Sequence, residues 1–261
     1  MNSRTTRLAM TIVLAASAFA LGCDPKLTGT EGDGGTGTPT QVTVVTPEAL
    51  IVGNIVAFHT DLFAAALSVS ADYDSSSALR AFETDCVSLE PVVTARASTA
   101  RYELLFDGCV DSHGTTYRGG GQLLVVNDQD GYTFLPLFDT NLIRATNESN
   151  DDYNHDLTAG SFEFAFQRDG SDNIVGIRVD KFLRHGVRGD VVTFSYGDVT
   201  YSGGIGEHGE YPDNGSVARV VWDGVGLFDV NYSGGPTASY SFGGGSYSVN
   251  LSTGDVSIVE I

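Results

Sequence analysis

The chain has few basic residues. Lys and Arg together number 14 against 33 Asp and Glu, which gives a formal net charge of -19 over 261 residues. A surface of this sign repels the phosphates of nucleic acids and anionic lipid headgroups. We therefore expect no nucleic-acid partner. The charge is compatible with a bound cation or a basic partner, but solubility is the simpler explanation.

The sequence also lacks the common catalytic motifs. It has no Gly-x-Ser-x-Gly, no His-Glu-x-x-His, no phosphate-binding P-loop and no spaced Cys pairs. The five histidines are scattered along the chain, and we interpret them as surface or loop residues: His59, His113, His155, His185 and His208. The sequence thus favours a protein that is not an enzyme and that needs no cofactor.

Oxygen ligands for a metal ion gather in two segments. One is the turn Asn127–Gly131, and the other is a predicted polar loop over residues 146–157 that carries Asp151, Asp152 and Asp156. Neither segment has the twelve-residue spacing and closing Glu of the common calcium loop. Asp, Asn and Gly are also the residues that turns require. We expect no metal site, with bound Ca²⁺ as the alternative.

The first 22 residues have the three parts of a secretory signal peptide. Arg4 and Arg7 give a positive start, residues 8–21 are mostly apolar, and small residues precede the expected cleavage site. The apolar run has about fourteen residues, whereas a membrane-spanning helix needs about twenty. We therefore expect residues 1–22 to be removed from the mature protein.

The segment Ala20-Leu21-Gly22-Cys23 resembles the lipobox of bacterial lipoproteins. The resemblance covers only the first 23 residues and implies cleavage before Cys23, with fatty acyl chains such as palmitate on its thiol and on the new amino terminus. Two or three chains anchor a protein stably to a membrane. The resemblance thus implies a cell-envelope lipoprotein, with the outer membrane favoured over the inner one. An ordinary signal peptide followed by a fortuitous Cys is the alternative.

The next segment is rich in Gly, Thr and Asp and has almost nothing to bury. We predict a flexible tether over residues 23–41 with an end-to-end distance of roughly 20–25 Å. The remainder, residues 42–261, is long enough for a single domain with its own core.

Only two cysteines remain besides Cys23. In an oxidising compartment Cys86 and Cys109 are expected to form one disulfide. It would close a loop of about two dozen residues and stabilise the fold by roughly 3 kcal/mol. A metal site built on these thiols would need further ligands, and no nearby His or Cys supplies them at a familiar spacing.

One segment has a clear helical period. Thr46 suits the N-cap, and Pro47 and Glu48 suit the first turn. The pattern predicts an amphipathic helix from Pro47 to about Ser70, with one apolar stripe formed by Ile51, Ile55, Phe58, Leu62, Ala65 and Val69. Asp61 lies off this stripe, so Asp61→Ala is expected to have little effect, whereas Phe58→Asp is expected to unfold the domain.

The rest of the domain alternates between apolar and polar residues, most clearly at 162–166 and 175–179. Gly-Gly pairs follow an aromatic residue at 117–120, 201–204 and 232–235, and they predict turns, bulges or close backbone approaches. About twelve strands with short connections predict an antiparallel meander. We expect a mainly β domain in which a curved sheet or barrel covers the helix.

Two functions remain open at this point, since no motif identifies a ligand or reaction. The first is a non-enzymatic structural or binding β-module held on the membrane by its lipid anchor. The second is a carrier of a lipid or other apolar ligand in a pocket between sheet and helix. A sizeable empty cavity under the helix would favour the carrier, and a closely packed interface would favour the module.

Overall fold

The described part of the chain forms one α-helix and one large antiparallel sheet. The computed structural model describes residues 44–67, 86–92, 99–126, 131–135, 143–171, 174–202 and 211–259. All of them belong to the unit Val42–Ile261. The predicted signal peptide, Cys23 and the predicted tether lie outside the described residues.

Helix α1 spans Pro47–Leu67. The Ala49 amide donates a hydrogen bond to Thr46 Oγ1 at 3.2 Å, which confirms the predicted N-cap. Every residue from 51 to 66 is buried, so the helix is enclosed on all sides. The prediction of an amphipathic helix with one buried stripe is therefore wrong: Asp61, which lies off that stripe, is also buried, at 0% exposed.

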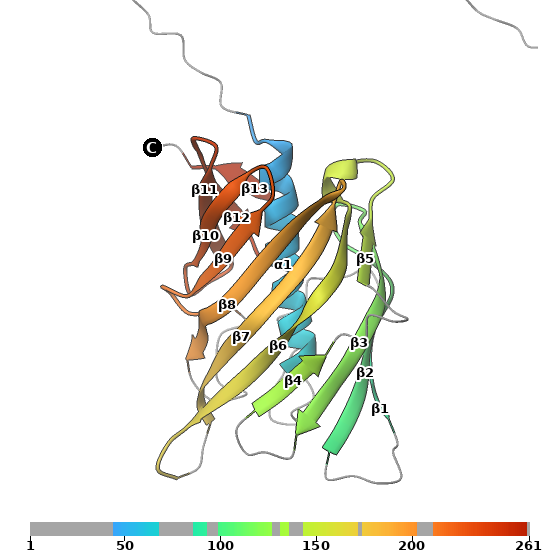
Figure 1. The fold of residues 1–261 in the computed structure, drawn as a ribbon, viewed down its shortest axis with the longest axis vertical. Coiled ribbons are helices and arrows are strands. Elements are labelled where there is room, and N and C mark those ends of the chain that lie inside the picture. Colours follow the sequence, from blue (N-terminus) through green and yellow to red (C-terminus); the bar gives the residue numbers. More distant parts are fainter. Residues whose placement is uncertain are drawn as a thin grey trace, which may run out of the picture. The chain divides into compact units, whose positions relative to one another are not determined.

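The thirteen strands pair antiparallel in one sheet (Figure 1). Their order is β1-β2-β3-β4-β6-β7-β8-β9-β10-β11-β12-β13, and β5 pairs with both β3 and β6. This arrangement confirms the predicted fold class. The bounds are β1 Val87–Pro91, β2 Thr99–Val110, β3 Thr116–Val126, β4 Gly131–Leu135, β5 Ile143–Thr146, β6 His155–Arg168, β7 Ile174–Val187, β8 Asp190–Ser202, β9 Val217–Trp222, β10 Gly226–Tyr232, β11 Thr237–Phe242, β12 Gly245–Asn250 and β13 Val256–Ile258, with a 3₁₀ turn, η1, at Asp151–Tyr153.

The sheet bends around α1 until strands far apart in its order approach each other. In the turn between β2 and β3, the Ser112 hydroxyl donates to the Thr253 carbonyl at 3.4 Å, and His113 Nε2 lies 3.4 Å from Asp255 Oδ1. Thr253 and Asp255 belong to the turn between β12 and β13. Within the described strands, β1 and β13 remain the two ends of the order, so the sheet is curved and open rather than a closed barrel.

The first half of α1 packs against the last strands. The Tyr240 hydroxyl of β11 donates to the Ala49 carbonyl at 2.6 Å. A Cβ added at Gly53 would lie 2.3 Å from Val256 Cγ2 of β13, so only glycine allows this approach. α1 is also long and apolar enough to cross a membrane by length and composition, but 94% of its most apolar window is buried inside the protein.

The second half of α1 packs against the middle strands through aromatic rings. The Phe58 ring lies 5.3 Å from Tyr117 of β3 and 5.6 Å from Phe106 of β2, measured between centroids. The Phe63 ring lies 4.9 Å from Phe162 of β6. Offset and edge-on contacts of this kind add stability beyond the area they bury. The core is therefore the space between α1 and the concave face of the sheet.

The Gly-Gly pairs have different surroundings. Gly120 lies inside β3, and a Cβ there would come within 2.0 Å of the Leu104 carbonyl oxygen of β2. Gly234, with φ of 78°, lies in the turn between β10 and β11. The predictions of a close backbone approach and of a turn are confirmed at these two places. Residues 203–204 lie outside the described residues.

Candidate functional site

Three of the five histidines lie in the core, so their interpretation as surface or loop residues is wrong. His59, His155 and His185 are 1%, 4% and 0% exposed. They come from α1, the first position of β6, and β7. The sequence assigns His155 to a polar loop over 146–157, but β6 begins at this residue and turns its side chain inward.

The three imidazoles and one tyrosine form a continuous hydrogen-bonded chain. His59 Nε2 lies 2.7 Å from His185 Nε2, and His185 Nδ1 lies 3.1 Å from His155 Nδ1. The hydroxyl of Tyr196, from β8, is hydrogen-bonded to His59 Nδ1. We call these four residues the histidine chain. Its central member, His185, uses both ring nitrogens.

All four groups can be neutral and still satisfy every bond in the chain. A neutral imidazole has one N–H donor and one acceptor nitrogen. In one order, Tyr196 donates to His59, His59 to His185, and His185 to His155; the opposite order is equally consistent. One charged imidazole can still be accommodated, because its two N–H groups find an acceptor at each contact, but two charged imidazoles place N–H groups opposite each other. The chain therefore disfavours charge on more than one ring.

Burial also disfavours charge on these rings. Desolvation lowers the pKa of His59 well below 6.5, and His155 lowers it further. Desolvation likewise lowers the pKa of His185, with smaller contributions from His59 and His155. The pKa of Tyr196 is raised well above 10, first by burial and then by Tyr232 and Tyr201. His59, His185 and Tyr196 are thus neutral near pH 7.

Aromatic rings enclose the histidine chain. The Phe58 centroid lies 5.6 Å from that of His155 and 6.2 Å from that of His185. Phe194 meets His59 edge-on at 4.9 Å, and Phe63 lies 6.1 Å from the same ring. These rings replace water around the imidazoles, which is why desolvation is the largest cause of their lowered pKa.

A second buried polar group ties α1 to the turns at its side. Tyr117 Oη lies 3.1 Å from Asn54 Oδ1 and 3.0 Å from Asp111 Oδ2. Asp111 also accepts hydrogen bonds from the amides of His113 and Thr115, each at 2.9 Å. Asn54 donates to the Tyr153 carbonyl of η1 at 3.2 Å. These contacts fix the helix relative to β3 and η1.

The outer end of the histidine chain borders a groove of about 320 Å³. His155 lies at its edge with Arg144 and Arg188. Arg144 Nε pairs with Asp156 at 3.1 Å, and Arg188 pairs with Asp152. Two of the carboxylates considered above as calcium ligands, Asp152 and Asp156, are therefore paired with these arginines.

The geometry does not bring ligands together around a metal ion. No group of three His, Cys, Asp or Glu in the described part of the chain is arranged to hold one. Two zinc-bound nitrogens lie about 3.3 Å apart in tetrahedral geometry, whereas His59 and His185 are in direct hydrogen-bond contact at 2.7 Å. Asp151 accepts a hydrogen bond from Asn154 at 3.0 Å. Residues 127–130 lie outside the described residues.

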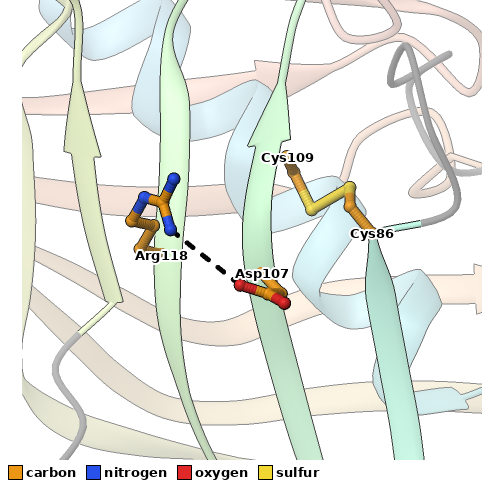
Figure 2. The surroundings of a disulfide bond; sticks show 4 residues. All are labelled: Cys86, Asp107, Cys109 and Arg118. Carbon is orange, nitrogen blue, oxygen red and sulfur yellow. Dashed lines mark ion pairs between the residues drawn. A yellow bond between two sulfur atoms is a disulfide. The ribbon is translucent and has the colours of Figure 1, made fainter.

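Cys86 and Cys109 form the predicted disulfide, with their Cα atoms 5.2 Å apart (Figure 2). The bond joins the residue before β1 to a bulge near the end of β2, where Gly108 has φ of 74°. Asp107 and Arg118 lie beside it as an exposed ion pair at 3.9 Å. The disulfide thus holds the first strand of the order to the sheet.

Comparisons of the chain with protein-family models, curated proteins and solved structures find no match. Two local signals pointed to the buried histidines. His185 shares one strand face with the apolar residues Leu183 and Val187, and His59 lies one helical turn after Ile55. Their mutual contacts depend on strand register, which neither signal contains.

Proposed function

We propose that the protein is a lipid-anchored lipoprotein of the cell envelope, with the outer membrane favoured, and that its domain is a non-enzymatic structural or binding module. The anchor would be Cys23, from the lipobox resemblance. The observation that carries the module is the packed contact between α1 and the sheet, since a carrier needs that space for its ligand.

The packing supports the module over the apolar carrier along the whole helix. Phe58 and Phe63 occupy the space between α1 and β2, β3 and β6. At the other end, Gly53 approaches Val256 too closely to admit even a methyl group. A lipid chain under α1 would have to displace these side chains.

The state of the histidines supports a non-enzymatic role. A general base must reach the proton that it removes. His59 and His185 are almost fully buried, are bonded to each other, and have lowered pKa values because of burial. Their geometry fits a structural role in the core better than proton exchange with a substrate.

The anchor can be tested by mass spectrometry of the mature amino-terminal peptide. We expect a peptide that begins at Cys23 and carries acyl chains, and a Cys23→Ser variant that is not acylated and leaves the membrane fraction. A Cys86→Ala variant serves as the control, because it replaces a cysteine without touching the motif. An unmodified Cys23, or retention of residues 1–22, would contradict the anchor.

The module can be tested by native mass spectrometry of the protein purified from its own membrane. We expect the mass of the acylated chain alone or of a complex with a protein partner. A lipid-sized ligand that leaves only when the domain unfolds would contradict the module and favour the carrier. Cys23→Ser protein provides the control for lipids retained through the anchor.

A further inference from the structure

We propose that the histidine chain is a pH-sensitive lock: its neutral form holds the second half of α1 against β6, β7 and β8, and mild acidification releases that half from the sheet. The proposal goes beyond the function proposed above and does not depend on it. It starts from the position of the chain, whose members come from four different elements: α1, β6, β7 and β8.

The lock acts on one half of the helix. His59 is the only member of the chain on α1, and its two bonds join the helix to His185 and Tyr196. The first half of α1 is held separately, through Ala49 and Gly53. Loss of the imidazole contacts therefore frees residues 58–66 before residues 47–54.

The chain can hold one proton beyond its neutral form, but a second proton breaks the pattern of donors and acceptors. His185 contacts an imidazole nitrogen on both sides, at 2.7 Å and 3.1 Å. When it is charged, both of its nitrogens donate, so both neighbours must accept. A second proton on the chain then places two N–H groups opposite each other among aromatic side chains that cannot accept a strong hydrogen bond. The two imidazoles can avoid this contact only by moving apart.

The other titratable and charged groups near the histidine chain are tyrosines, one buried aspartate and two ion pairs. From β3 comes Tyr117, bonded to Asp111, and from β8 and β10 come Tyr201 and Tyr232. Asp61 is buried on α1 but lies two residues from His59, on roughly the opposite side of the helix. The charged groups of the groove are paired with each other: Arg144 with Asp156 and Arg188 with Asp152.

His155 gives the proton a route inward. It is the most exposed of the three imidazoles, at 4%, and it borders the groove. Its Nδ1 contacts His185, which in turn contacts His59. Nε2 of His155 is itself buried, so the proton enters through a local opening at this end of the chain and can then pass along existing hydrogen bonds to His59.

The direction of the effect follows from burial. In the opened state the imidazoles regain a pKa of about 6.5, whereas in the closed state the pKa values of His59 and His185 lie well below it. Below pH 6.5 the opened state binds more protons, so acid favours opening. Between pH 7.5 and pH 5.5 each of the two residues raises the opening constant about 10-fold, and both together about 100-fold.

Amide hydrogen exchange of the wild-type domain tests the lock directly. We expect residues 58–66 to exchange through an opening of their own: their protection factors should fall about 100-fold from pH 7.5 to pH 5.5, after correction for the intrinsic rate, and should stay below those of β9–β12 at both pH values. Unchanged protection of residues 58–66 would overturn the proposal. So would protection factors equal to those of β9–β12 at both pH values, because residues 58–66 would then exchange only when the whole domain unfolds.

A matched pair of variants assigns the effect to the chain. In His185→Gln only His59 of the two low-pKa imidazoles remains, so the fall should shrink to about 10-fold. His113→Gln, a histidine outside the chain that stacks on Tyr153, should keep the 100-fold fall. Equal falls in the two variants overturn the assignment. The wild-type exchange experiment decides the proposal independently if His185→Gln does not fold.

Discussion

Both halves of α1 contribute to the buried stretch 51–66, but they are held by different chemistry. The first half uses a hydroxyl-to-carbonyl bond and a glycine contact with β11 and β13, groups that do not change charge near neutral pH. The second half uses aromatic rings and imidazoles that contact β2, β3, β6, β7 and β8. Burial alone thus does not tell how a helix responds to solution conditions; the chemistry of its contacts does.

The largest expected effect comes from a charge in the second half. Phe58→Asp places a carboxylate among Phe106, Tyr117 and His155 and should cost more than about 4 kcal/mol, enough to unfold the domain. Phe58→Leu is the control, since it keeps an apolar side chain. Circular dichroism melts measure both. A cooperative Phe58→Asp melt near the wild-type temperature would show that this half is not the core.

The disulfide provides a reference that does not involve the helix. Replacing both Cys86 and Cys109 by Ala should lower the free energy of unfolding by about 3 kcal/mol, by the same amount at pH 7.5 and pH 5.5. Arg118→Ala, which removes only the exposed ion pair beside the bond, should have little effect. Denaturant titrations measure the change, and a pH-dependent loss would contradict this expectation.

The first half is tested at Gly53. Gly53→Ala should destabilise by about 1–2 kcal/mol despite the better helix propensity of Ala, because the new Cβ meets Val256. Gly170→Ala is the matched control, since nothing lies within 4 Å of a Cβ there. Equal stability of the two variants, in urea titrations, would mean that Val256 moves aside at no cost.

The smallest expected effect is the loss of one hydroxyl. Tyr240→Phe removes the bond to the Ala49 carbonyl and should cost about 1 kcal/mol, with no change between pH 7.5 and pH 5.5. The loss of stability caused by Tyr240→Phe should be the same at both pH values, whereas the change caused by His185→Gln should depend on pH. This contrast is the sharpest measure of the difference between the two halves. Thermal melts at both pH values provide it.

The sequence was sufficient for the architecture because the fold repeats a local pattern. Period-two alternation and turn residues predict the meander, and the capping residues at Thr46 and Pro47 predict where α1 begins. The disulfide was predictable because only two cysteines remain besides Cys23. These features depend on local sequence and do not require knowledge of which strand lies beside which face of the helix.

The site could not be predicted in the same way. His59, His155 and His185 are separated by 96 and 30 positions, and their contacts depend on the register of β6 and β7. The enclosure of α1 also escaped prediction, because the apolar stripe from Ile51 to Val69 accounts for one face only. A sheet curved tightly enough to bury the other faces, Asp61 included, is a property of all thirteen strands together.

The polar residues inside α1 have a consequence before the domain exists. α1 is made ahead of every strand that will surround it, and its composition alone would suit a lipid bilayer. When a translocation channel inserts a helix into the membrane, an Asp at the helix centre costs about 2.5–3.5 kcal/mol. If the chain is exported, as proposed above, Asn54, His59 and Asp61 would oppose insertion of the new helix into the membrane until the sheet closes around it.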